Sequence, residues 1–267
     1  MDYLGRMLKL TNCRCGLKQW KVDSLVVEVY DTRKTMGISA AKQVIRKIKD
    51  IIAEKGSVNM AFAAAPSQNE FLAELCNTKE VDWNKVTGFH LDEYIGLPKE
   101  APQSFRRFLD DNIFHKIPLG KVHYLNGNAE NLQDECDRYS CLLKEHSLDI
   151  ACIGIGENGH IAFNDPHVAD FEDPHWVKTV DLDERCRRQQ VNDGCFADIR
   201  DVPVNALTLT IPAIMSTRHI YCIVPGPTKQ EAVRNTLEGP IDTDCPASIL
   251  RTHPSARLII DRDASRL

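Results

Sequence analysis

Two short segments of the sequence carry residues that could move protons on a polar substrate. In FHLDEYIGLP (residues 89–98), a run of alternating apolar residues ends in two carboxylates, Asp92 and Glu93. The second segment, GIGENGHIAFNDP (residues 154–166), is a glycine-rich loop that brings His160 among short polar side chains. A carboxylate base and an imidazole are sufficient for general acid–base catalysis. The two segments therefore predict acid–base chemistry.

The two adjacent carboxylates cannot both face the same cleft. Neighbouring residues on an extended strand point to opposite sides. We expect Asp92 to be the functional carboxylate and Glu93 to be structural, although the pair could also simply cap the helix that follows.

The glycine loop matches GxGxxG through Gly154, Gly156 and Gly159, directly after a strand. Dinucleotide binding would need a helix that starts at this loop and faces the pyrophosphate. Pro166 leaves no room for that helix, so we interpret the loop as a small-ligand loop, with a plain tight turn as the alternative. Glycine allows the backbone to approach a ligand closely, and Gly159 is the candidate for substrate contact.

A lone histidine is more often a packing or capping residue than a catalyst. His160 differs because Asn158, Asn164 and Asp165 surround it in the sequence. A catalytic histidine needs a partner that fixes its tautomer, and a nearby carboxylate also favours its protonated form. Asp165 is the predicted partner.

Two further junctions between a strand and a helix resemble anion sites. Lys229 follows the strand HIYCIV (residues 219–224) through PGPT, at the start of a helix. Free amides, the helix dipole and the ammonium group would converge there on a phosphate. Ser67 follows NMAFAAA (residues 59–65) and either caps the next helix or donates to the same anion. A phosphate clamp, a base and a histidine in one cleft are typical of an enzyme that acts on sugar phosphates.

Apolar periodicity predicts that strands and helices alternate along the chain. Such alternation indicates one Rossmann-like α/β domain, with a mostly parallel sheet and helices on both faces. Residues 25–267 form this domain, and residues 1–24 are predicted to be a peripheral extension. Ser104 is expected to cap one helix. The strands are predicted at residues 25–30, 59–65, 85–91, 148–155, 175–182, 205–210, 219–224 and 257–262, and the helices at 38–55, 69–76, 104–114, 131–146 and 229–239.

Composition excludes several classes of protein. The 267 residues carry a net charge of -5 with no basic stripe, which argues against nucleic-acid binding. No apolar run reaches the roughly 20 residues that span a bilayer. The ten cysteines contain no CxxC pair, so neither a disulfide framework nor a metal site is expected. A reducing cytoplasm is the simplest location.

The motifs together resemble the glucosamine-6-phosphate deaminases, a family of aminosugar-phosphate isomerases and deaminases. The resemblance covers residues 25 to 262. It rests on FHLDEYIGLP for the family's FxxDEYxGLP, on GIGENGHIAFNDP for GxGxxGHIxFNEP, and on VPVNALTLTI for VPxxALTxxI. Lactonases of the same fold carry a different ending where this chain has FNDP.

The resemblance implies that glucosamine 6-phosphate and water give fructose 6-phosphate and ammonium, without a metal or cofactor. His160 would open the sugar ring, and Asp92 would move a proton from C2 to C1. Asn158 and Asp165 would orient His160. The implied substrate-binding residues are Ser67, Gly159, Lys229 and an arginine of CRRQQ, Arg187 or Arg188.

The chain departs from the family pattern at several of these positions. Asp165 stands where the family usually has glutamate, and Asn158 where some members have aspartate. The first phosphate loop reads AAAPSQN instead of a sequence rich in glycine and threonine. These changes leave room for a related aminosugar phosphate such as the galactosamine epimer.

Two alternatives remain open. A 6-phosphogluconolactonase would need no base at Asp92. A non-catalytic sugar-phosphate sensor is the other, although no helix-turn-helix pattern precedes the domain. The family includes monomers and hexamers, so the chain could also form a homo-oligomer.

Overall fold

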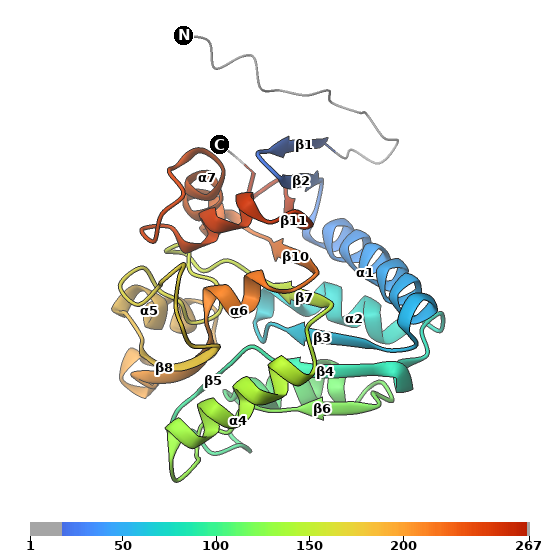
Figure 1. Ribbon diagram of the computed structural model, residues 1–267. Helices are drawn as coiled ribbons and strands as arrows, with labels where there is room; N and C mark the ends of the chain where they lie inside the picture. The colour runs from blue at the N-terminus through green and yellow to red at the C-terminus, as the bar shows by residue number, and fades with distance from the viewer. Residues whose placement is uncertain (1–17, 266–267) are drawn as a thin grey trace.

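The main feature of the computed structural model, which describes residues 18–265, is an eight-stranded sheet (Figure 1). All neighbouring strands are parallel except the antiparallel edge pair β1–β2. In spatial order the strands are β1 (Lys18–Val22), β2 (Leu25–Tyr30), β11 (Ala256–Asp261), β10 (His219–Val224), β7 (Ile150–Ile153), β3 (Val58–Phe62), β4 (Val86–His90) and β6 (Lys121–His123).

Helices cover both faces of this sheet. The strand residues alternate between two apolar cores: in β10, Tyr221 belongs to one core and Cys222 to the other. The first core contains α1 (Arg33–Lys55), α2 (Asn69–Asn77) and α3 (Phe105–Leu109), which continues as a π-helical turn, Asp110–Phe114. The second contains α4 (Leu132–Glu145), α6 (Ile211–Met215) and α7 (Gln230–Glu238). The predicted α/β fold is confirmed.

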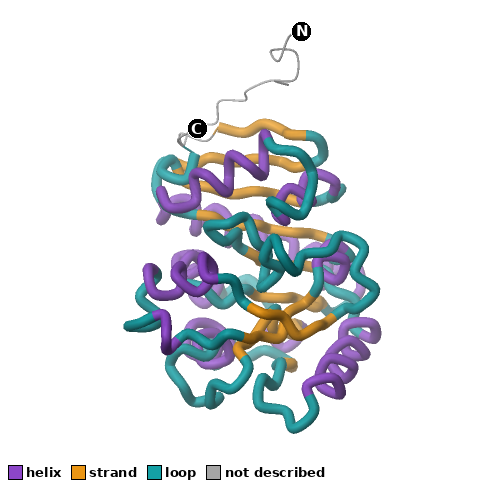
Figure 2. Tube along the Cα trace, turned by 90° about the vertical axis from the view of Figure 1, so that its left-hand side faces the viewer, coloured by secondary structure: helices purple, strands orange, loops and turns teal. Residues whose placement is uncertain are grey.

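A second, three-stranded antiparallel sheet stands beside the first (Figure 2). It consists of β5 (Asp92–Tyr94), β9 (Asn205–Leu209) and β8 (Val177–Asp181), and α5 (Glu184–Asn192) follows β8. Only Leu91 separates β4 from β5. Asp92 therefore lies just beyond the carboxyl edge of the main sheet, where a parallel sheet places its ligands.

The ends of several elements differ from the prediction. Helix α1 begins at Arg33 and not at residue 38, because Thr32 caps it by accepting a hydrogen bond from the Thr35 amide at 3.1 Å. Ser104 caps α3 as predicted, accepting from the Arg107 amide at 3.1 Å. Of the predicted extension, residues 1–17 lie outside the described residues, whereas strand β1 belongs to the sheet.

The described part of the chain also bears on the cysteines and on membranes. All eight described cysteines are free thiols, and Cys13 and Cys15 lie outside the described residues. Within residues 18–265, no helix has the length and apolar character needed to cross a membrane.

Candidate active site

A cleft of about 250 Å³ lies at the carboxyl ends of β3, β7 and β10. The loops that follow these three neighbouring strands form much of its wall, and β5 contributes Asp92. Four residues predicted from the sequence line it: Ser67, Asp92, His160 and Lys229. They come from four separate segments, so the fold brings together side chains that are far apart in the sequence.

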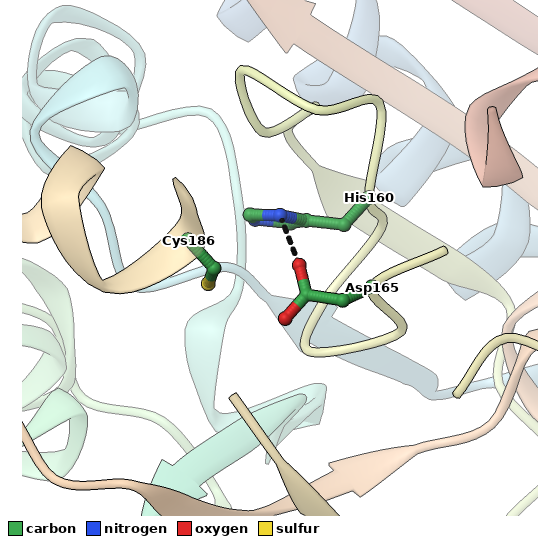
Figure 3. Close-up of side chains that lie close together, drawn as sticks. All are labelled: His160, Asp165 and Cys186. Atoms are coloured by element: carbon green, nitrogen blue, oxygen red, sulfur yellow. Dashed lines mark ion pairs between the residues drawn. The ribbon is translucent and has the colours of Figure 1, made fainter. Parts of the chain in front are cut away.

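The His160 ring is held from one side by its own loop. Its Nδ1 lies 2.9 Å from Oδ1 of Asp165 (Figure 3). The same Nδ1 lies 2.7 Å from Oδ1 of Asn158. Asn158 in turn donates from Nδ2 to the same Asp165 oxygen at 2.8 Å. Because Nδ1 faces these partners, Nε2 is left for the cleft that His160 lines. The structure thus puts Asp165 within hydrogen-bonding distance of His160 despite its short side chain.

Asp165 is completely buried. Burial alone raises the pKa of this carboxyl group. The neighbouring imidazole and the hydrogen bonds from His160, Asn158 and the Asp183 amide outweigh burial and lower the pKa to about 2. Asp183 caps α5 and also accepts from Asn158 Nδ2 at 2.9 Å. Asp183 was not predicted, because nothing in its sequence neighbourhood links it to the histidine loop.

Cys186 of α5 faces the same carboxylate (Figure 3). The ligand atoms of His160, Asp165 and Cys186 lie within 4.8 Å of one another, a spacing that could hold a metal ion. Metal binding needs the thiolate form. Burial, together with the charges of Asp165 and Asp183, raises the pKa of the Cys186 thiol well above its ordinary value. A protonated thiol suits a hydrogen bond to Asp165, and the cluster fits that role better than a metal site.

The two carboxylates of β5 have separate environments. Asp92 lines the cleft, is only 7% exposed, and its Oδ1 accepts no hydrogen bond from the described residues. Burial, with a contribution from the charge of Glu93, raises the pKa of Asp92 to about 8. Glu93 points away and accepts from the amides of Phe105 at 3.1 Å and Arg106 at 2.8 Å, at the start of α3. Of the two carboxylates, only Asp92 lines this cleft, as strand alternation predicts, and its catalytic role stays a prediction.

Lys229 and Ser67 both reach the cleft. Lys229 is 5% exposed, and its ammonium group forms no ion pair or hydrogen bond within the described residues. Burial lowers the pKa of Lys229. No side chain caps the 3₁₀ turn Pro66–Gln68 or helix α2, so Ser67 is not a helix cap. Its hydroxyl group accepts from Gln68 Nε2 at 3.0 Å and stays beside the cleft.

Two predicted substrate-binding residues do not line the cleft. The guanidinium of Arg187 donates to the carbonyls of Ile199 at 2.7 Å and Val202 at 2.9 Å, so it holds the segment after α5. Gly159 adopts a left-handed φ of 86° and donates its amide to the Gly156 carbonyl at 3.0 Å. Its role is to close the turn. Arg188, the alternative to Arg187, pairs with Glu184 on the exposed side of α5.

Five polar residues that line the cleft were not predicted as site residues: Arg33, Gln189, Gln190, Asp193 and Thr228. Gln189 accepts from the Glu157 amide at 2.8 Å and so braces the histidine loop. In the sequence CRRQQ the arginines were predicted to bind the substrate, whereas helix α5 turns the two glutamines towards the cleft. A helical register assigned to residues 184–192 could have separated the two groups.

The chain is similar to known proteins over most of its length. Residues 31–259 match the model of the glucosamine-6-phosphate isomerases/6-phosphogluconolactonase family. A glucosamine-6-phosphate deaminase of Bacillus cytotoxicus is 36% identical over 220 residues, which cover 82% of each chain.

Two solved structures share the fold. A monomeric glucosamine-6-phosphate deaminase superposes with a TM-score of 0.81 at 33% identity, covering 90% of this chain and 98% of its own. A 6-phosphogluconolactonase from Thermotoga maritima superposes with a TM-score of 0.72 at 20% identity, covering 88% of this chain and 99% of its own, and indicates the fold alone. The chain belongs to the glucosamine-6-phosphate isomerase and 6-phosphogluconolactonase family.

Proposed function

We propose that this protein converts glucosamine 6-phosphate and water to fructose 6-phosphate and ammonium. The observation that carries the proposal is the pairing of Asp92 and His160 in one cleft. Asp92 offers a buried carboxylate without a protein donor on Oδ1. His160 offers an imidazole whose Nδ1 is fixed by Asp165. The relatives described above, which are glucosamine-6-phosphate deaminases, give the same substrate class.

In the proposed mechanism, His160 opens the sugar ring. Asp165 stabilises the protonated imidazole because its own charge is retained at neutral pH. A proton is transferred to the ring oxygen and the proton of the C1 hydroxyl group is lost, so the bond between the ring oxygen and C1 breaks and the open-chain aldehyde results. Asn158 keeps the ring in place by contacting both His160 and Asp165.

Asp92 performs the proton shift that follows. Its carboxylate removes the proton from C2 while the aldehyde oxygen takes up a proton from solvent, which gives an enolamine, and it then returns the C2 proton to C1. The product is a C2 iminium, to which water adds before ammonium leaves. A base whose pKa is near the working pH is well matched to this double role of base and acid, and burial provides that match for Asp92.

A lactonase is the second candidate, because the fold is shared with 6-phosphogluconolactonases. Hydrolysis of a lactone requires no proton transfer at C2, so Asp92 would have no function in it. The deciding experiment measures ammonium release from glucosamine 6-phosphate and galactosamine 6-phosphate, alongside hydrolysis of 6-phosphogluconolactone. We expect ammonium from at least one aminosugar phosphate. Lactone hydrolysis without ammonium release would refute the proposal.

The setting and assembly of the protein are part of the same proposal. The free thiols of the eight described cysteines support a reducing cytoplasm. A homo-oligomer stays a prediction, and the solved deaminase described above is monomeric. Size-exclusion chromatography with light scattering would measure the assembly directly.

A further inference from the structure

Resting on the proposed function, we infer that Arg33 binds the phosphate group of the substrate together with Lys229. Arg33 is the first residue of α1 and lines the cleft. Among the described residues that line the cleft, Arg33 and Lys229 are the only lysine or arginine side chains. The phosphate arginine would therefore come from α1 and not from α5, where the sequence suggested it.

The geometry of Arg33 leaves part of its guanidinium available to a ligand. Nε lies 2.7 Å from Oε1 of Glu70, and Nη2 donates to the carbonyl of Pro66. Nη1 forms no hydrogen bond with any described residue. The contact with Pro66 holds the planar group next to Ser67, the neighbouring cleft residue. A fixed, planar guanidinium group with free N–H groups is suited to donating hydrogen bonds to a phosphate group.

Helix α5 supplies no cation to the cleft. Arg185 pairs with Glu231 at 2.6 Å, Arg187 binds two backbone carbonyls, and Arg188 pairs with Glu184. The α5 residues that do reach the cleft are the uncharged Gln189 and Gln190. No arginine of α5 is therefore available to bind a phosphate group in this cleft.

Lys229 gives independent evidence that the cleft receives an anion. A buried ammonium is costly unless an opposite charge or hydrogen bonds compensate it. Lys229 is more than nine-tenths buried, and it pairs with no described carboxylate. Asp193 lines the same cleft and adds a negative charge. One lysine would have to offset both Asp193 and a dianionic phosphate. Arg33 pairs with Glu70 through Nε, and its remaining N–H groups give the cleft a second cationic donor for the phosphate.

The test compares three variants that each remove one positive charge and retain an apolar stem. Arg33→Met and Lys229→Met remove the two cleft cations. Lys34→Met is the matched control, because Lys34 is exposed and does not line the cleft. A hydrogen bond to a charged group contributes about 1.5–3 kcal/mol, so KM for glucosamine 6-phosphate should rise about 10- to 100-fold in Arg33→Met. Arg33→Lys, which keeps the charge without the planar fork, should lose less.

A binding measurement separates this inference from the proposed reaction. Titration calorimetry with glucitol 6-phosphate and with glucitol reports the phosphate contribution without any turnover. We expect the preference for the phosphorylated probe in the parent and in Lys34→Met, and a preference about 10- to 100-fold smaller in Arg33→Met, with an unchanged unfolding temperature. If ammonium release fails while this pattern holds, Arg33 remains a phosphate ligand for another sugar phosphate. Equal affinity of the parent and Arg33→Met for glucitol 6-phosphate, or no preference in the parent, would overturn the inference.

Discussion

Gly156 lies directly against the ring of His160. A Cβ atom at Gly156 would stand 2.0 Å from Cε1 and 2.3 Å from Nδ1 of that ring. The Gly156 amide also donates to the His160 carbonyl at 2.9 Å, so the two residues close the loop on each other. The glycine is therefore required by close approach, since any side chain would displace the imidazole.

The first prediction concerns Gly156→Ala. The methyl group would push the imidazole from its position against Asp165, and a displacement of about 1 Å can reduce the rate about 100-fold. We expect kcat to fall by roughly 10- to 100-fold, with a much smaller change in KM, because the phosphate site is untouched. Steady-state kinetics and thermal unfolding on one preparation measure this. Unchanged kcat in a folded variant would show that the ring has room to move.

The charge of Asp165 is the subject of the second prediction. Asp165→Asn removes the carboxylate that stabilises the protonated imidazole while it keeps the shape of the side chain. Turnover of the ring-closed substrate should fall at least tenfold, and an open-chain analogue, which bypasses ring opening, should be affected far less. Asp170→Asn, an exposed position in the same segment, is the matched control. Equal losses on both substrates would assign His160 to the proton shift instead.

Asp92 predicts an unusual pH dependence of stability. Burial raises its pKa in the folded protein from 3.8 to about 8, so the folded state disfavours the ionised form. Below about pH 4, Asp92 is protonated in both the folded and the unfolded chain, so it does not reduce the free energy of unfolding. As the pH rises from 4 towards 8, only the unfolded chain ionises freely, and the free energy of unfolding falls. In Asp92→Asn, position 92 does not titrate, so its contribution to the free energy of unfolding does not change with pH.

We therefore expect the stability advantage of Asp92→Asn over the parent to grow between pH 4 and pH 8, by about 2 kcal/mol or more. Urea unfolding of both proteins at several pH values measures the difference, and any pH-independent cost of the amide cancels in the comparison. A constant difference across this range would mean that Asp92 is already ionised in the free protein near its ordinary pKa.

The sequence predicted those parts of the site that depend on local pattern. Alternation along an extended strand separates Asp92 from Glu93, and the loop after a buried strand fixes the position of His160. Strand-to-helix junctions similarly identify Ser67 and Lys229. Each inference needs only the residues within one segment, together with the rule that parallel strands end at a common edge.

The parts that were missed depend on packing between distant segments. Arg33 reaches Pro66 and Glu70 only because α1 packs beside α2. Arg187 was wrongly predicted to reach the cleft, because the direction of its side chain depends on where helix α5 begins. Asp183, the N-cap residue, sets that start. Strands β1 and β6 are short edge strands with exposed residues, so they lack the buried run that marks a strand.

The role of Asp92 as the catalytic base is tested by the rate of ammonium release by Asp92→Asn, with the affinity for fructose 6-phosphate measured on the same preparation. Asparagine retains the shape of the side chain and removes its basicity. If Asp92 is the base, kcat falls by roughly 100-fold or more while the affinity stays within a few-fold of the parent. Asp111→Asn, an exposed control, behaves like the parent. Turnover by Asp92→Asn at the parental rate would contradict the assignment of Asp92 as the base.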